Sequence, residues 1–306
     1  MTLSEEEERY EDKRILDHSS SEISTEDAAV LMETLMQEMR RGGYEFYTGT
    51  SYRHLLIHKF GSVVELTAPH DILTKRIGEY LPQDAVLREM METSYRILSN
   101  HPLNLERKAK GLNPANSVWF WGAGTRPMLT SFEEKYHKKG AMISAVDLLK
   151  GIAVGAGLDT IIVEGANGGL HTNYTGKAEA AVDALAAQNY DFVYVHIEAP
   201  DEMGHQGSIP DKIKAIENID QKIIGPIVGE LEDLCMDFRT LVLPDHPTPI
   251  CVRTHTGNPV PYLLYDSRKK AEGMPEYSER LGNKSPLFEK EGHRLLSRLF
   301  EMDNER

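Results

Sequence analysis

Two different spacings of apolar residues run through the chain, and the change between them falls near residue 117. In the first part, residues 25–41 and 85–98 place apolar side chains every three or four positions, which is the spacing of a helix with one buried face. Ser24, ahead of the first stretch, is a typical helix N-cap. Short runs rich in aromatic and branched side chains predict a small antiparallel sheet. These runs are residues 44–47, 52–57 and 63–66.

From residue 117 onward, short apolar runs alternate with longer amphipathic stretches. This alternation is typical of a mainly parallel α/β sheet with helices on both faces. The predicted strands are residues 117–121, 141–144, 160–163, 191–195 and 239–243. The predicted helices are residues 147–156, 176–187, 209–234 and 286–302, with a kink expected in the third at Gly225-Pro226.

Charge and polarity mark the predicted domain boundaries. Residues 1–14 are acidic and polar and are predicted to form a charged leader, either a frayed tail or an exposed helix. Residues 106–116 are rich in Lys, Gly and Asn, which is typical of a linker. We therefore divide the chain into the leader, an α+β domain at 15–115 and an α/β domain at 116–306.

Composition narrows the classes of partner. The 306 residues carry a net charge of −14, from Lys+Arg 34 against Asp+Glu 48, which disfavours nucleic acid or an anionic membrane as partner. A small anionic substrate stays open, because a local group of cations can override the net charge. Two cysteines, no signal peptide and no apolar run long enough to span a membrane predict a cytoplasmic protein.

Chemistry-bearing residues follow the predicted strand at 191–195. Asp201 and His205 lie four positions apart, after a predicted break into a loop at Pro200. Loops at the ends of buried strands are where α/β proteins place their chemistry. A carboxylate oxygen and an imidazole nitrogen can bind one Zn²⁺ or Mn²⁺ ion. Taken alone, this stretch is explained equally well by an exposed surface turn.

Two further stretches strengthen the metal hypothesis. Asp245 and His246 follow the predicted strand at 239–243, in a loop stiffened by two prolines. His255 stands in a Thr-His-Thr run a few residues later. Three such stretches in order predict a metal centre, with two ions as one option.

The amino-acid sequences of these stretches resemble those of one known family. The runs EISTEDA, NPANSVWFWGAGTRP, TNYTGKAEAA, EAPDEMGHQG and LPDHPTPICVRTHTGNPVPYLLY are similar to those of the archaeal-type, cofactor-independent phosphoglycerate mutases of the alkaline-phosphatase superfamily. The resemblance extends from about Arg14 to the C-terminal helix. It implies an alkaline-phosphatase-like α/β fold with a smaller inserted substrate domain. It also implies interconversion of 3-phosphoglycerate and 2-phosphoglycerate by metal-dependent phosphoryl transfer, without bisphosphoglycerate as cofactor.

The same resemblance assigns the metal ligands. Asp201, His205 and His255 are expected to hold one ion, and Asp245 with His246 to hold part of a second. The expected ions are two Mn²⁺, with Mg²⁺ or Zn²⁺ as alternatives.

Substrate-binding candidates are chosen by residue type and family-like context. Arg126 follows a Gly-rich turn, where its guanidinium could bind phosphate or carboxylate. Arg53 and His54 are further candidates, although edge-strand polar residues look the same. His70 or Asp71 could move a hydroxyl proton, although the pair also fits a simple turn. Two lysines, Lys150 and Lys177, are predicted to lie on helix surfaces.

One part of the family pattern has no counterpart in this sequence. The family begins with an Asp-bearing strand and a loop that carries the Ser nucleophile, so the nucleophile of this chain is unassigned. Three interpretations stay open. The chain is a mutase completed by a separate N-terminal chain, another phosphatase or phosphotransferase of the superfamily, or an inactive or split fragment that acts as a metal- or partner-binding protein.

Overall fold

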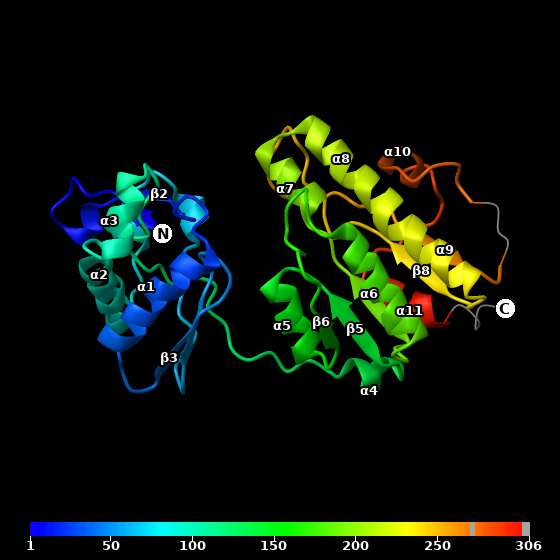
Figure 1. Cartoon of the computed structure of the whole chain (residues 1–306), viewed down its shortest axis with the longest axis horizontal. Coiled ribbons are helices and arrows are strands. Elements are labelled where there is room, and N and C mark those ends of the chain that lie inside the picture. Colours follow the sequence, from blue (N-terminus) through cyan, green and yellow to red (C-terminus); the bar gives the residue numbers. More distant parts are fainter. Residues whose placement is uncertain (270–272, 302–306) are drawn as a thin grey trace. The chain divides into compact units, whose positions relative to one another are not determined.

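The computed structural model describes residues 1–269 and 273–301, and its contacts divide the chain into two compact units (Figure 1). Unit 1 is Met1–Pro127 and unit 2 is Met128–Arg306. Within the described residues, no helix has the length and apolar character needed to cross a membrane.

Two helices and a hairpin enclose the larger core of unit 1. Helix α1 (Thr25–Glu38) begins where the Ser24 hydroxyl accepts the N–H of Asp27, and α2 (Ala85–Leu98) is capped in the same way by Asp84. Both helices were predicted. Strands β3 (Tyr44–Tyr47) and β4 (Leu55–His58) pair antiparallel. The buried residues of α1 share one face and pack with those of α2. They are Ala28, Leu31, Met32 and Leu35 from α1 and Leu87, Met90 and Leu98 from α2.

The N-terminal residues belong to this unit, so the leader prediction for 1–14 was wrong. Strand β1 (Thr2–Leu3) pairs antiparallel with β2 (Ile15–Asp17), and a 3-10 turn, η1 (Tyr10–Asp12), lies between them. Leu3 and Ile15 are fully buried in a second apolar cluster. This charged stretch is held by a few apolar residues. Their spacing is too wide to give the periodic pattern of a helix or strand, so the sequence did not reveal their burial. The cluster also contains Tyr10, Ile72, Ile77, Met91 and Trp119.

The stretch predicted as a linker is also part of the folded unit. Helix α3 (Pro102–Ala109) covers its first half, and the residues that follow are held by buried amides. Asn104 donates to the carbonyls of Leu98 and Ala115 and accepts the N–H of Ala115, all at 2.9 Å. Asn116 makes two matching bonds with the backbone of Leu3. The side-chain amides of Asn104 and Asn116 thus bond backbone groups that no neighbouring strand pairs with. A polar composition alone does not distinguish such a buried stretch from an exposed linker.

Two predicted strands that fall in unit 1 are absent from the described residues. Residues 63–66, predicted for the small sheet, and residues 117–121, predicted to begin the α/β part, form neither strand nor helix. Two 3-10 turns, η2 (Pro69–Ile72) and η3 (Gly78–Tyr80), complete the unit.

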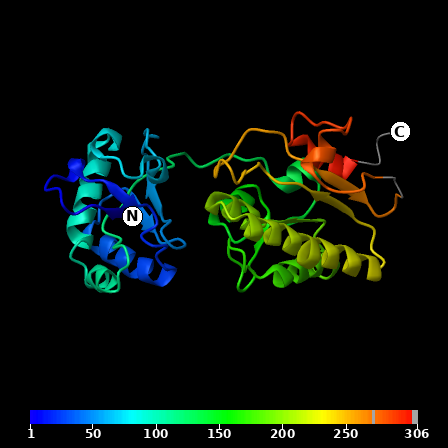
Figure 2. The same ribbon diagram turned by 90° about the horizontal axis from the view of Figure 1, so that it is seen from above.

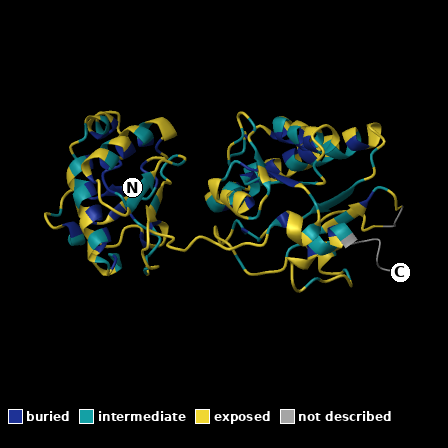
Figure 3. Cartoon of the chain, turned by 90° about the horizontal axis from the view of Figure 1, so that it is seen from below, coloured by how far each residue is buried: buried dark blue, intermediate teal, exposed yellow. Residues whose placement is uncertain are grey.

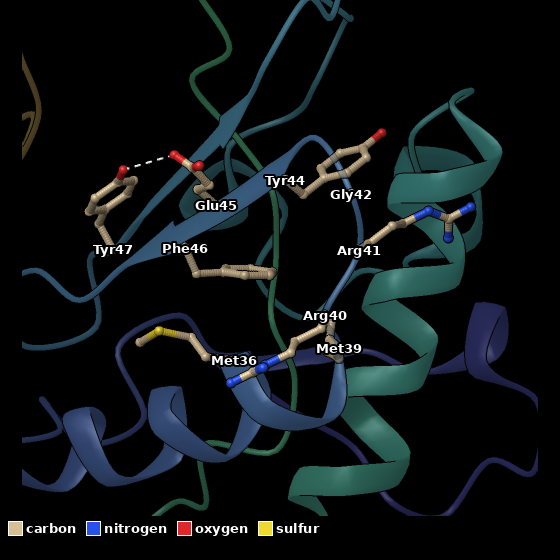
Figure 4. Close-up of a pocket in the computed structure, with 9 residues that line it drawn as sticks. All are labelled: Met36, Met39, Arg40, Arg41, Gly42, Tyr44, Glu45, Phe46 and Tyr47. Carbon is tan, nitrogen blue, oxygen red and sulfur yellow. Dashed lines mark hydrogen bonds between the residues drawn. The ribbon is translucent and has the colours of Figure 1, made fainter.

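A shallow groove lies between the C-terminal end of α1 and strand β3 (Figure 4). The phenol of Tyr47 donates to Glu45 at 3.0 Å along its rim. None of the predicted substrate-binding residues lines this groove. Its lining residues are Met36, Met39, Arg40, Arg41, Gly42, Tyr44, Glu45, Phe46 and Tyr47.

A parallel sheet forms the centre of unit 2. Strand β5 (Gly140–Ile143) lies between β6 (Asp159–Ile161) and β7 (Phe192–Val195), and all three run parallel. Helices α5 (Asp147–Gly155) and α6 (Tyr174–Ala186) supply the crossovers, as predicted for strand-helix alternation. Figure 2 shows the helices of this unit packed beside its strands.

A second, antiparallel pair of strands extends the unit. Strand β8 (Arg239–Val242) pairs with β9 (Leu263–Asp266), and the register partners Arg239 and Asp266 form an ion pair at 3.0 Å. Three short helices, α4 (Phe132–Tyr136), α10 (Glu279–Gly282) and α11 (Arg294–Glu301), complete the described part. The helix predicted at 286–302 is thus shorter at its start, and residue 302 lies outside the described residues.

The predicted long helix at 209–234 is confirmed as one continuous rod, and at the kink expected near Gly225-Pro226 the helix is not broken but contains a π turn (Figure 1). It consists of α8 (Ile209–Ile219), a π-helical turn, η4 (Asp220–Ile224), and α9 (Gly225–Asp233). The π turn ends two residues before Pro226, which lacks a backbone N–H and whose ring would clash with the carbonyl four residues earlier in a regular helix. Figure 3 shows buried residues on the inner faces of the helices and exposed residues on their outer faces.

The buried amide of Asn104 gives a stability prediction for unit 1. Replacing Asn104 by Ala leaves the N–H and the carbonyl of Ala115 without partners, while the carbonyl of Leu98 keeps the N–H of His101, and it is expected to lower the free energy of unfolding by about 1–3 kcal/mol. Both tryptophans of the chain, Trp119 and Trp121, lie in unit 1. Their fluorescence in a urea titration therefore reports its unfolding. The matched control, exposed Asn100→Ala, should unfold at the wild-type midpoint, and an unchanged midpoint for Asn104→Ala would contradict the prediction.

Candidate metal centre

Helix α7 (Ala199–Gln206) places the first two predicted ligands on one face. It follows β7 directly, and Pro200 stands in its first turn, where the missing N–H has no cost. The predicted loop at this position was therefore wrong, because proline starts a helix here. Asp201 and His205 lie one turn apart, with Asp201 Oδ2 3.3 Å from His205 Nε2.

The loop after β8 brings the other histidines to the same place. His255 Nε2 lies 3.2 Å from His205 Nε2 and 3.4 Å from Asp201 Oδ1. The ring of His246 lies against that of His255, with centroids 3.7 Å apart and planes tilted by 30°. Asp201, His246 and His255 each offer one ligand atom within 4.8 Å of the others.

Asp245 lies beside this cluster and is mostly exposed. Its Oδ2 is 3.4 Å from His246 Nε2, and its Oδ1 accepts the N–H of His246 at 3.0 Å. The structure thus brings all five predicted metal-ligating residues into one region of unit 2.

The protonation pattern of the cluster fits a bound cation. His205 Nδ1 lies 3.0 Å from the carbonyl oxygen of Arg253, which can only accept a hydrogen bond. Nδ1 of a neutral ring therefore carries the proton, and the lone pair is on Nε2. That lone pair faces a second imidazole nitrogen and the Asp201 carboxylate. A divalent metal stabilises imidazole nitrogens and a carboxylate oxygen that converge in this way, and nitrogen with carboxylate oxygen suits Mn²⁺ or Zn²⁺.

The end of α7 is shaped to hold His205 in this orientation. Gly207 closes the helix with φ of +74°, a left-handed value that favours glycine. A Cβ at this position would lie 2.5 Å from the guanidinium of Arg253. Glycine therefore leaves room for the Arg253 side chain beside the end of the helix.

Two groups that follow or contact strand β7 were missed or misplaced by sequence reasoning, buried Lys177 and half-buried His196. Lys177, predicted as a surface residue, is 1% exposed and donates to the carbonyl oxygen of His196 at 2.9 Å. Burial lowers the pKa of Lys177, and Glu198 opposes the shift. Burial likewise lowers the pKa of His196, partly opposed by Asp245. The signal for Lys177 was its helical spacing from buried Ala181. Lys150 is on the helix surface as predicted, paired with Asp147.

Four of the five substrate-binding candidates lie on the hairpin and the η2 turn of unit 1. His70 meets Trp121 edge-on at 5.5 Å and stands 6.2 Å from His18. His18 in turn contacts Tyr52 at 5.4 Å, and the guanidinium of Arg53 lies over the Tyr52 ring. His18 was not among the predicted candidates.

The remaining substrate-binding candidates make fewer contacts with other side chains. His54 Nδ1 accepts the N–H of Gly49 at 3.2 Å, and Asp71 Oδ1 lies 3.8 Å from His70 Nε2. Arg126 is exposed in the extended segment that ends unit 1.

The α/β fold and the Asp/His cluster define a metal-dependent enzyme class, and comparison with known proteins agrees. The sequence model of the Metalloenzyme superfamily matches residues 16–295. The 2,3-bisphosphoglycerate-independent phosphoglycerate mutase of Methanosarcina barkeri is 49% identical over 279 residues, which cover 88% of this chain and 70% of the relative. A probable enzyme of the same name from Geobacter sulfurreducens is 42% identical over 290 residues, covering 93% of this chain and 72% of the relative.

Two solved structures share the fold. PH0037 protein from Pyrococcus horikoshii superposes with a TM-score of 0.74 at 27% identity, covering 96% of this chain and 73% of that chain. The cofactor-independent phosphoglycerate mutase of Thermoplasma acidophilum superposes with a TM-score of 0.56 at 23% identity, covering 94% and 73%. The chain therefore belongs to the metalloenzyme superfamily and, within it, to the family of 2,3-bisphosphoglycerate-independent phosphoglycerate mutases. The alkaline-phosphatase-like fold class predicted from sequence is confirmed.

The ligand cluster predicts stabilisation by metal. Adding Mn²⁺ at about 100 times its dissociation constant should raise the free energy of unfolding by about 2.7 kcal/mol, seen as a higher melting temperature. His255→Ala removes a nitrogen that faces both Asp201 and His205 and should abolish the shift. His293→Ala, at an exposed histidine far along the chain, should keep it. A wild-type protein that responds to none of Mn²⁺, Zn²⁺ and Mg²⁺ would refute the site.

Proposed function

We propose that this chain carries the metal-binding and substrate-binding machinery for interconversion of 3-phosphoglycerate and 2-phosphoglycerate by phosphoryl transfer. The observation that carries the proposal is the convergence of Asp201, His205, His246 and His255 at the ends of β7 and β8 in a member of this family. The two cysteines, Cys235 and Cys251, are both free thiols, which supports a reducing, cytoplasmic setting.

The residues that would hold the ions divide as the family resemblance implies. Asp201, His205 and His255 would hold one ion, and Asp245 with His246 would hold part of a second, with two Mn²⁺ as the proposed ions. Bound divalent cations would supply positive charge to the oxygens that attack and leave phosphorus. No bisphosphoglycerate is required in this scheme.

Unit 1 would recognise the organic part of the substrate. Arg53 and Arg126 carry guanidinium groups suited to bidentate contacts with carboxylate or phosphate. His70, with Asp71 beside it, is the proposed group for moving the hydroxyl proton. His54 is the remaining candidate for contact with the substrate anion.

A second function is favoured by the hydroxyl chemistry of the cluster. Thr248 contacts the ligands, but it is 4% exposed and its hydroxyl donates to Asp201. It is therefore committed to a structural bond and is not available to attack phosphorus.

A chain without a nucleophile would act as a metal- or partner-binding protein. A separate polypeptide that carries the family's Asp and Ser would instead make it one part of a split enzyme. Phosphate release would point to another phosphatase of the superfamily.

A coupled assay separates these functions. Purified chain with Mn²⁺ and 3-phosphoglycerate is assayed for 2-phosphoglycerate and for inorganic phosphate, with and without a polypeptide carrying the family's Asp and Ser. We expect isomerisation, lowered more than about 100-fold in His246→Ala, since even outer-shell substitutions at metal sites cost 10- to 100-fold. His293→Ala should be fully active. Folded, metal-loaded protein that is inactive in both arms would leave the binding function, and phosphate release without isomerisation would identify a phosphatase.

The role of Arg53 is tested by binding alone, which needs no nucleophile. Loss of one charge-assisted hydrogen bond costs about 1.5–3 kcal/mol, so Arg53→Met should weaken 3-phosphoglycerate binding about 10- to 100-fold in calorimetry. Arg53→Lys keeps the charge and should lose less. Exposed Arg96→Met, in α2 of the same unit, is the matched control. Equal affinity in Arg53→Met and Arg96→Met would remove Arg53 from the substrate site.

A further inference from the structure

We infer that Thr248 is a positioning residue that joins the two halves of the metal centre and fixes the tautomer of His246. The inference rests on the proposed metal-dependent function and assigns a role to a residue outside the ligand set. Its basis is the position of the Thr248 hydroxyl, which carries a single proton and lies within hydrogen-bond distance of two ligand side chains, Asp201 and His246.

The hydroxyl lies between a ligand from α7 and a ligand from the loop after β8. Thr248 Oγ1 donates a short hydrogen bond to Asp201 Oδ1, because a carboxylate only accepts. Thr248 Oγ1 also lies 3.3 Å from His246 Nδ1. A hydroxyl has a single proton, and that proton is already given to Asp201. The contact with His246 is therefore a hydrogen bond only if Nδ1–H donates to Oγ1.

This requirement sets the state of the His246 ring. A neutral imidazole with its proton on Nδ1 carries its lone pair on Nε2. Nε2 is the nitrogen beside Asp245 Oδ2, at 3.4 Å. Thr248 thus directs the metal-binding nitrogen of His246 toward Asp245 while it holds the Asp201 carboxylate, and one side chain links the ligands assigned to the two ions.

The surrounding structure holds Thr248 in place. It is 4% exposed and stands between Pro247 and Pro249, which restrict the backbone on either side. Its carbonyl oxygen accepts from Lys212 Nζ of α8 at 2.6 Å.

The packing against α7 is equally close. A Cβ on Gly204 of α7 would lie 2.6 Å from the Thr248 carbonyl oxygen and 3.0 Å from its methyl group. The loop can therefore lie against the helix that carries Asp201 because this position is glycine. A surface threonine that met its neighbours by chance would have neither anchor.

Paired variants at Thr248 test the role. Thr248→Val keeps the shape and removes the hydroxyl, whereas Thr248→Ser keeps the hydroxyl and removes the methyl group. Mn²⁺ binding is measured by titration with electron paramagnetic resonance of the free ion. Thr248→Val should weaken binding of at least one ion about 10- to 100-fold, the usual effect of losing an outer-shell partner, and Thr248→Ser should stay within about threefold of wild type.

A matched control separates the specific effect from the loss of any buried hydroxyl. Thr172 is also 4% exposed in unit 2, but its Oγ1 accepts the N–H of Asn167 and contacts no proposed ligand. Thr172→Val should therefore bind Mn²⁺ as wild type does. Equal Mn²⁺ affinity in Thr248→Val and wild type would overturn the inference.

The tautomer is read directly, without metal or turnover. Long-range proton–nitrogen correlation spectra of histidine-labelled, metal-free protein report which ring nitrogen is protonated, and His246→Gln identifies the His246 signals. Wild type and Thr248→Ser should show the Nδ1–H form, and Thr248→Val a mixture. An Nε2–H ring in wild type would overturn the inference even if Thr248→Val failed to fold. Absence of mutase activity would count against the proposed function alone, because neither measurement uses phosphoglycerate.

Discussion

The carboxylate of Asp201 is the contact on which the metal centre depends. One oxygen faces His205, and the other faces His255 and accepts from Thr248, so helix α7 and the loop after β8 meet at one side chain. Negative charge at this point offsets the crowding of imidazole nitrogens around it. The α7 helix and the loop after β8 are each short, and neither has a core of its own. Their shared carboxylate therefore fixes where strands β7 and β8 deliver their ligands.

The centre could be predicted because its ligands follow strands. A buried strand has a strong apolar pattern, and the first polar residues after it stand at the sheet edge whatever the details of the connection. Asp201, His205 and His246 were found in this way. The local form of the chain was less predictable, since Pro200 fits both a loop and the first turn of a helix. Thr248 carried no signal of its own, because its role depends on which side chains surround it.

Prediction from the sequence failed where buried polar side chains hold the fold together by hydrogen bonds. The amides of Asn104 and Asn116 are fully buried and replace backbone pairing, so a stretch that looks like a linker is interior. In the same way, Leu3 and Ile15 anchor a charged N-terminal stretch through isolated apolar contacts that no periodic pattern reveals. Lys177 shows the same error, because a long cationic side chain was assigned to solvent, whereas it is buried and its Nζ donates to the carbonyl oxygen of His196. A periodic apolar pattern in the sequence identifies the buried face of a helix or strand. The burial of a single polar side chain follows only from the three-dimensional structure.

The π turn in the rod of α8 and α9 limits how this protein can vary in length. A π turn accommodates one residue more than an α turn, so the residues before and after it are out of step by about 100° about the axis. Ile223 and Leu231 are buried in this offset arrangement. Deleting one residue from 220–224 would give a more regular helix, yet it would rotate Leu231 out of the interior. Homologues should therefore conserve the length of this segment more strictly than its sequence.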